Sequence, residues 1–194
     1  MLRSLLTALF LSLCSTNLLA TELLPFQASY TADWKQLPFT GSATRSLTKQ
    51  SKDDTWQLSF EASMIVAGVK ETSVLRIEND DILPIKYRYQ RTGLGKAKKL
   101  KQDFDWQNYL VSGIEKKKPY QLPLLAGVLD KSSYQLALQR DVAAGLKSMS
   151  YSVLDGDDLD TYDFRLLGEE EVTTSVGQLR AISVERVRDA SRSK

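Results

Sequence analysis

The chain has 194 residues, of which 26 are basic and 24 acidic, and it contains no histidine and one cysteine. This length suits one domain with one hydrophobic core. The small net charge of +2 argues against general nucleic-acid binding, which needs a strongly basic surface. The lack of histidine excludes Ser-His-Asp triads, Cys-His nucleophiles and histidine-ligated zinc sites.

Residues 1–20 have the anatomy of a secretory signal peptide. Arg3 is positively charged, Leu5–Leu13 is apolar, and Ala20 is the small residue expected before a cleavage site. A membrane anchor is the alternative, but the apolar stretch is shorter than the roughly 20 residues that a spanning helix needs. We therefore expect cleavage after Ala20, export to the periplasm and no stable transmembrane segment in the mature chain.

Lipid attachment at Cys14 is a weaker alternative, because the bulky Leu13 precedes it. Cleavage after residue 20 would remove this cysteine together with Arg3, so that 25 basic residues would face 24 acidic ones. The mature chain would then have no disulfide and would depend on core burial for stability.

Apolar side chains alternate with polar ones along most of the remaining chain, which predicts half-buried antiparallel strands. The alternating segments are residues 26–34, 56–64, 85–89, 100–106, 149–153, 162–166 and 182–187. Gly and Asp residues separate several of these runs, as hairpin turns do. Residues 171–183, centred on Gly177, read as a terminal hairpin.

One segment has a different period. From Asp130 to Ala144, Tyr134, Leu138 and Val142 recur every four residues, which predicts an amphipathic helix over about residues 130–144. Asp130 suits the N-cap of this helix, and Gly145 suits its C-terminal stop.

These elements predict a mainly β fold, in which one antiparallel curved sheet or open β-barrel carries one amphipathic helix packed on it. We see no linker that would divide residues 21–194, and we expect a single β-rich domain.

Four aromatic residues on inward faces are the candidate ligand-binding residues. They are Trp34, Phe60, Tyr87 and Phe104. A curved sheet lined with such side chains can enclose a cavity for an apolar molecule. The same pattern also describes a fully packed core.

Acidic residues cluster at Asp155, Asp157, Asp158 and Asp160 around Gly156. Their carboxylates could offer oxygen ligands to calcium in a weak site. The main alternative is an Asp–Gly hairpin turn with solvated side chains. A catalytic carboxylate pair is a third interpretation. We expect no other cofactor.

Lysines form a basic patch in two groups. They are Lys96, Lys98, Lys99 and Lys101, followed by Lys116, Lys117 and Lys118. The intervening residues 100–114 read as a hairpin, so the two groups could meet at one end and attract an anionic headgroup, polysaccharide or protein. The alternative is a solvated, solubilising pair of loops.

Four stretches resemble the bacterial exported family called domain of unknown function 3108. They are LPFQASYTADW from residue 24, LPLLAGVLDKSSYQLALQRD from residue 122, YSVLDGDDLDTYDFRLLG from residue 151 and EVTTSVGQLRAISVERV from residue 171. The resemblance implies an envelope address and a β-rich fold, with further C-terminal strands beyond residue 194. It implies no catalytic motif.

Together these features predict a non-enzymatic envelope protein that binds a lipid or another amphiphile in a β cavity. A structural module that docks on another envelope protein or on polysaccharide is the first alternative. A carboxylate-dependent hydrolase using Asp157 or Asp160 is the second.

Overall fold

The computed structural model describes residues 23–33, 40–51, 53–93 and 97–188. The predicted signal peptide, Trp34 and Lys96 lie outside these residues, so what was predicted for them stays a prediction. Within the described part, no helix is long and apolar enough to cross a membrane.

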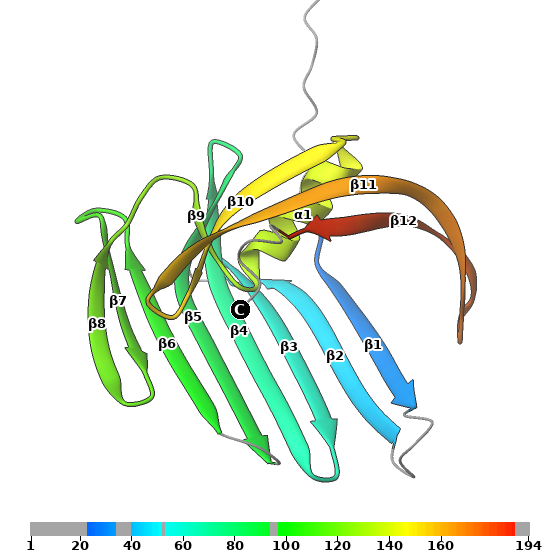
Figure 1. Cartoon of the computed structure of the whole chain (residues 1–194), viewed down its shortest axis with the longest axis horizontal. Coiled ribbons are helices and arrows are strands. Elements are labelled where there is room, and N and C mark those ends of the chain that lie inside the picture. Colours follow the sequence, from blue (N-terminus) through cyan, green and yellow to red (C-terminus); the bar gives the residue numbers. More distant parts are fainter. Residues whose placement is uncertain (1–22, 34–39, 52, 94–96, 189–194) are drawn as a thin grey trace, which may run out of the picture.

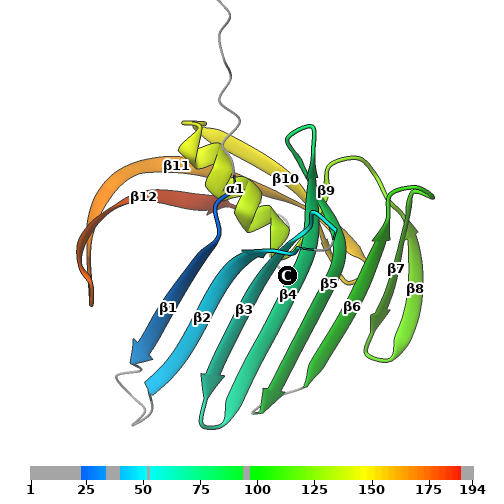
Figure 2. The same ribbon diagram turned by 180° about the vertical axis from the view of Figure 1, so that it is seen from behind.

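Eight consecutive strands form a large antiparallel sheet in chain order (Figure 1). They are β1 (Phe26–Asp33), β2 (Thr40–Lys49), β3 (Trp56–Met64), β4 (Ala67–Glu78), β5 (Asp81–Gly93), β6 (Lys98–Asp105), β7 (Leu110–Glu115) and β8 (Lys118–Pro123). Because each strand pairs with the next one, the β3–β4 and β7–β8 turns lie at one end of the sheet. We call this the tip end; the β4–β5 turn lies at the opposite end (Figure 2).

Four further strands form a second sheet in the order β12-β11-β10-β9. They are β9 (Val128–Asp130), β10 (Ser148–Asp155), β11 (Asp158–Thr174) and β12 (Gly177–Val187). β9 and β10 are parallel, because the helix α1 (Ser133–Ala143) provides the crossover that parallel strands need.

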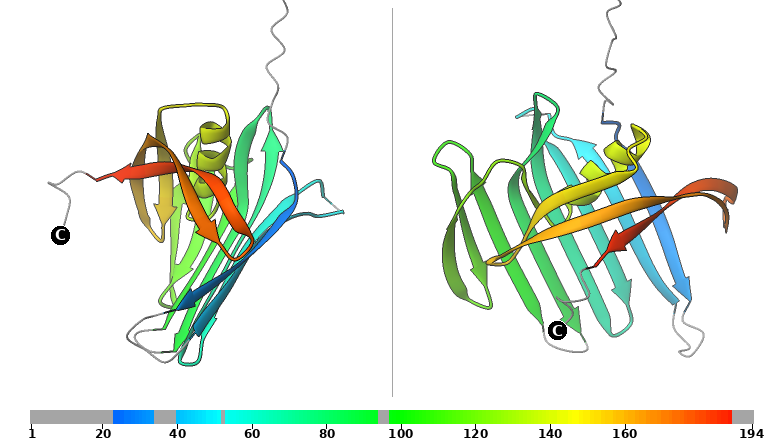
Figure 3. Two further views of the ribbon diagram at one scale, coloured as in Figure 1. Left: turned by 90° about the vertical axis from the view of Figure 1, so that its right-hand side faces the viewer. Right: turned by 45° about the horizontal axis from the view of Figure 1, so that its top comes forward.

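The second sheet lies across the inner face of the large sheet, with α1 between the two (Figure 3). It covers the part of that face that is remote from the tip end, and the large sheet continues beyond it toward the tip end (Figures 1 and 3). The outer face of the large sheet carries mainly polar side chains and faces solvent.

The predicted fold class is confirmed: the protein is mainly β, with a curved antiparallel sheet that is not closed into a barrel and with one helix packed on it. One detail differs, because the strands divide into two sheets instead of one. The difference follows from α1, which returns the chain across the inner face and starts the second sheet there.

The helix begins later than predicted: its N-cap is Ser132, and the predicted N-cap Asp130 ends β9 instead. Asp130 still stabilises the start of the helix, from two residues before the N-cap, and Gly145 ends the helix as predicted. The Asp130 carboxylate accepts bonds of 2.8 Å from the backbone N–H groups of Ser132 and Ser133, and the Ser133 hydroxyl accepts one of 2.9 Å from the N–H of Asp130. This reciprocal pair resembles a capping box. At the other end Gly145 has φ +84°, and the N–H of Leu146 reaches the carbonyl of Asp141 at 3.0 Å, as in a Schellman motif.

Two clusters of buried side chains hold the layers together. The larger cluster joins β2–β5 of the large sheet to α1, β10 and β11, with Leu75 wholly buried at 0% exposure. The smaller cluster packs β5–β8 against Val128 and Leu154 of the second sheet. The two sheets therefore share apolar cores along the covered part of the inner face.

Gly113 leaves room for an aromatic ring on the neighbouring strand. It faces Tyr120 across the β7–β8 pair, and a methyl group added to Gly113 would overlap the Tyr120 ring. We expect Gly113→Ala to lower the free energy of unfolding by about 1 to 3 kcal/mol, the usual cost of overpacking. Urea denaturation measures this, with the exposed neighbour Ser112→Ala as control. Equal stability of both variants would show that the ring moves away without cost.

Candidate functional site

A groove runs between the two sheets along the side where they are not joined. β1 is the edge strand of the large sheet and β12 is the edge strand of the second sheet, and α1 lies between them. We call this groove, of about 680 Å³, the seam groove. Its lining residues are Phe26, Ala28, Tyr30, Arg45, Tyr134, Gln135, Leu138, Gln139, Val142, Ile182 and Val184.

Most residues that line the seam groove are apolar or aromatic because three amphipathic elements turn one face toward it, and polar groups provide about half of its exposed surface. β1 contributes alternate residues, α1 contributes residues one turn apart, and β12 contributes Ile182 and Val184. Tyr30 and Ile182 are 51% and 44% exposed, so these walls are hydrated where no ligand covers them. Apolar side chains that are exposed together along one groove often mark a binding surface, whereas single exposed apolar side chains are common on any protein.

Arg45 is the cationic residue among those lining the seam groove. It is half-buried on β2, opposite Phe60 of β3, and its guanidinium donates a hydrogen bond to the side-chain carbonyl of Gln135 on α1. A guanidinium can bind a carboxylate or phosphate through two parallel bonds. The groove thus combines apolar walls with one site for an anionic group.

Away from β1, where β6 and β7 meet the second sheet, lies a charged belt, formed by Lys98, Glu115, Lys131 and Asp155. The ammonium of Lys98 lies 3.0 Å from Glu115 and 3.6 Å from Asp155, while that of Lys131 lies 2.6 Å from Asp155. These side chains are between 18% and 36% exposed. The belt links β6 and β7 of the large sheet to the second sheet, which is a structural role.

Two acid–hydroxyl pairs lie on the inner face of the large sheet, one buried and one partly buried. The hydroxyl of Ser73 donates to the Asp130 carboxylate at 2.5 Å, and that of Tyr87 donates to Glu71 at 2.6 Å. Burial raises the pKa of Asp130 to about 6, and the bonds from Ser73, Ser133 and Ser132 lower it only in part. Burial, assisted by the neighbouring Glu71 charge, also raises the pKa of Tyr87 far above its ordinary value.

The four predicted ligand-binding aromatics have different surroundings. Tyr87 and Phe104, 1% and 5% exposed, belong to the smaller packed core. Phe60 is half-buried on the inner face beside Arg45. Trp34 lies outside the described residues. None of the three described aromatics lines the seam groove, and Phe60 is the cross-strand neighbour of one residue that does, Arg45.

The acidic cluster forms a hairpin turn, as the main alternative predicted. Asp155 pairs with Asp158 across β10 and β11, and Gly156 has φ +71°. Asp155 joins the charged belt, and Asp160 lies 3.8 Å from Arg186. Among the described residues no group of three or more acidic or cysteine side chains is placed to hold a metal ion.

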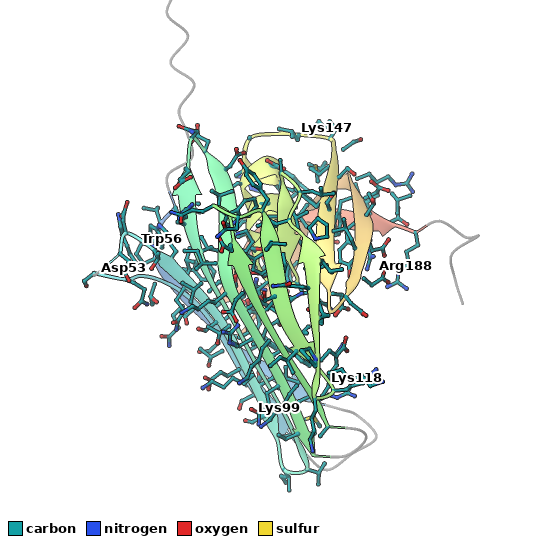
Figure 4. All side chains as sticks on the ribbon, turned by 90° about the vertical axis from the view of Figure 1, so that its left-hand side faces the viewer. Asp53, Trp56, Lys99, Lys118, Lys147 and Arg188 are labelled. Carbon is teal, nitrogen blue, oxygen red and sulfur yellow. The ribbon has the colours of Figure 1, made fainter. Side chains whose placement is uncertain are left out.

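The two lysine groups do meet at the tip end, because Leu100 pairs with Glu115 in the β6–β7 hairpin. Lys98 points inward to the charged belt, whereas Lys99, Lys101, Lys116, Lys117 and Lys118 are exposed. Figure 4 shows Lys99 and Lys118 at the same end of the molecule, far from Lys147. Lys98 therefore does not belong to the exposed basic patch, because it forms ion pairs with Glu115 and Asp155.

The sequence did not identify the seam groove. It did indicate the apolar faces of residues 26–34 and of the helix, but not that they border one groove. Gln102, which interrupts an apolar face in the sequence, is wholly buried and donates to the carbonyl of Gly156 at 3.0 Å. A polar residue on an otherwise apolar strand face was the available signal for this contact between the sheets.

The fold and the open seam define a β-barrel-like protein with one internal helix. The chain belongs to the DUF3108 family, described as "Protein of unknown function (DUF3108)", whose sequence profile matches residues 29–194; the predicted family membership is confirmed. No curated protein matches the chain significantly.

Among solved structures, the chain resembles a "beta-barrel-like protein of domain of unknown function DUF1849" from Brucella abortus. The TM-score is 0.51 at 14% sequence identity, and the match covers 87% of this chain and 82% of the other. At this identity the likeness concerns the fold alone.

Proposed function

We propose that this protein binds an amphiphilic molecule of the cell envelope in the seam groove and has no catalytic role. The observation that carries the proposal is the groove itself, whose apolar residues come from three elements. Several of these residues, Phe26, Leu138 and Val184 among them, pack against the larger core on one side and line the open groove on the other. Its volume of about 680 Å³ is within the range of about 300 to 1,000 Å³ that small-molecule sites span. Burial of an apolar chain there would remove hydrated apolar surface, which is the main driving force for such binding.

Arg45 indicates the charge that the polar end of the ligand would carry. A cation beside apolar walls favours a molecule with an acyl-like chain and an anionic carboxylate or phosphate. The bond from Arg45 to Gln135 of α1 holds the guanidinium in place, so that less side-chain entropy would be lost on binding. The predicted signal peptide supports a location in the periplasm, where envelope lipids are available.

The groove can be tested with cis-parinaric acid, an 18-carbon fluorescent carboxylate. We expect Ile182→Asn to weaken its binding at least tenfold. Tenfold corresponds to about 1.4 kcal/mol, close to the contribution of one buried aliphatic side chain. The matched control is Leu179→Asn, because Leu179 lies on the same strand at 49% exposure but does not line the groove. Equal affinities of the two variants, or no binding by the unmodified protein, would contradict the proposal.

The role of Arg45 needs a second comparison. Arg45→Gln should weaken binding of cis-parinaric acid about tenfold and leave binding of its neutral methyl ester within twofold, since only the acid can pair with the guanidinium. Thermal unfolding controls for the loss of the bond to Gln135. If both probes weaken equally while stability is unchanged, Arg45 contributes to the shape of the groove and not to recognition of charge.

Native mass spectrometry of the protein recovered from its own envelope would identify the natural ligand. Excess mass that matches a lipid, and that is lost in Ile182→Asn but kept in Leu179→Asn, is the expected result. A mass of the polypeptide alone in all three proteins would instead favour the alternative function, a structural module that docks on another envelope protein or on polysaccharide.

A further inference from the structure

The β3–β4 turn at the tip end carries two side chains that a hairpin turn does not favour. Met64 pairs with Ala67, so Ile65 and Val66 form the two-residue connection, with exposures of 75% and 41%. Two-residue turns favour Gly, Asn and Asp, which adopt the required backbone angles or bond to the backbone. Neither Ile65 nor Val66 has a positive φ, so the backbone of this turn tolerates them. As aliphatic residues, however, they form no side-chain bond to the turn and leave apolar surface in contact with water.

The β7–β8 turn at the same end carries residues that its backbone conformation disfavours. Lys116 and Lys117 have φ +50° and +69°, in the left-handed region that is costly for side chains other than those of Gly, Asn and Asp. At the opposite end, the β4–β5 turn has nearly the same angles, +49° and +69°, with Asn79 and Asp80, which suit this turn. The protein thus keeps two lysines at the tip end where better turn-forming residues exist.

The tip end is positively charged as well as apolar. Within the described part of the chain, no acidic side chain forms an ion pair with Lys99, Lys116, Lys117 or Lys118. Two of the nearby acids are already paired, Glu61 with Lys70 at 2.6 Å and Glu115 with Lys98 at 3.0 Å. A third, Asp157, lies beside Gly156, whose backbone approaches Glu115. Figure 4 shows that Lys99 and Lys118 project at this end.

We propose that the tip end docks on the surface of an anionic lipid bilayer. Ile65 and Val66 would enter the boundary between headgroups and acyl chains, and the exposed lysines would lie at the level of the lipid phosphates. Exposed aliphatic side chains at the same end of a molecule as exposed lysines are the combination that binds such surfaces. Binding to a polysaccharide would not remove Ile65 and Val66 from water. A tip-to-tip contact with a second copy of the chain would bring lysines of both copies together.

The proposal does not rest on ligand binding in the seam groove. It does place the uncovered part of the inner face, with the half-buried Phe60, Ala62 and Met64, next to the membrane. An amphiphile that leaves the bilayer would meet this face first.

The test is flotation with vesicles of phosphatidylcholine and phosphatidylglycerol at 3:1, compared with vesicles of phosphatidylcholine alone. Protein from cells that produce the full chain is used, and intact mass confirms that every variant carries the same N-terminus. We expect binding to the anionic vesicles at low salt, with at least a fivefold decrease in the bound fraction in high salt or on neutral vesicles. Ile65→Ser/Val66→Ser should cause a similar decrease. The control Leu125→Ser/Leu146→Ser, which changes exposed leucines away from the tip end, should stay within twofold.

A second variant separates charge from folding. Lys116→Asn/Lys117→Gly introduces residues that the turn prefers, so thermal stability should stay equal or rise while the bound fraction falls at least fivefold. Unchanged binding in this variant and in Ile65→Ser/Val66→Ser would overturn the proposal. So would self-association that is lost in Ile65→Ser/Val66→Ser without any vesicle binding, because this would assign the tip end to a second copy. Ile182→Asn should bind vesicles normally, which keeps this test distinct from that of the seam groove.

Discussion

The variant Asp130→Asn is expected to be more stable than the unmodified protein at pH 7.5, by about 3 kcal/mol, and nearly equal to it at pH 4. Asp130 is wholly buried at 0% exposure, and burial raises its pKa from about 3.8 to about 6. A shift of one pKa unit corresponds to about 1.4 kcal/mol. Asparagine can keep the carbonyl that accepts the two backbone N–H groups. Its NH2 group replaces the oxygen that accepts from Ser73, so the Ser73 hydroxyl must rotate and accept a hydrogen bond instead of donating one.

The direction of the pH dependence follows from which state loses its proton first. Below about pH 3.8 the carboxyl is protonated in both the folded and the unfolded protein, and its full stabilising contribution is present. Between about pH 3.8 and 6 the unfolded chain ionises first, so the stability from this group falls as the pH rises. Above about pH 6 the contribution is constant again.

Urea denaturation at several pH values between 4 and 7.5 measures the difference between Asp130→Asn and the unmodified protein. The exposed Asp163 provides a control, and Asp163→Asn should change the free energy of unfolding by less than about 0.5 kcal/mol at each pH. If Asp130→Asn is instead destabilising at pH 7.5, the ionised carboxylate is stabilised by Ser73 and the start of α1 more than burial penalises it.

Leu75→Ala should lower the free energy of unfolding by about 2 to 5 kcal/mol, the range for truncating a wholly buried leucine. Leu75 lies on β4 at 0% exposure, in the cluster that joins both sheets and α1. Leu159→Ala, at 44% exposure on β11, is the matched control and should cost under about 1 kcal/mol.

The same variant tests the predicted single domain. Tryptophan fluorescence reports on the large sheet through Trp56 and Trp106, and far-ultraviolet circular dichroism reports on all elements. Because the two sheets share their cores, both signals should shift together in one transition. Two separate transitions, with only the fluorescence change affected by Leu75→Ala, would show that the sheets unfold independently.

The sequence predicted strands well where one face is apolar and poorly where it is not. β1, β3 and β6 alternate clearly and were expected. β2 and β4 were not predicted, because their inward positions include Arg45, Glu71 and Ser73, whose polar groups are matched by partners distant in the chain. Ser73, for example, binds Asp130, which is 57 positions away. No local pattern contains such a partner.

The site was less predictable than the fold for a related reason. Alternation assigns a residue to a face, and it placed Tyr87 and Phe104 correctly on the inner one. Whether an inner-face residue is packed or lines a groove depends on where the second sheet and α1 lie. They cover Tyr87 and Phe104 and stop short of closing against β1.

By itself, the sequence determined the β-rich class, the existence of the helix and its C-terminal end, the Asp155–Asp158 hairpin and the family. These features depend on periodicity and on turn or capping residues, whose effects act within a few positions of the chain. Only the tertiary structure decided that there are two sheets, that Lys98 and Asp155 pair across them, and that a groove lines the open seam. Those features depend on contacts between distant segments, and their geometry is set by how two twisted sheets pack around one helix.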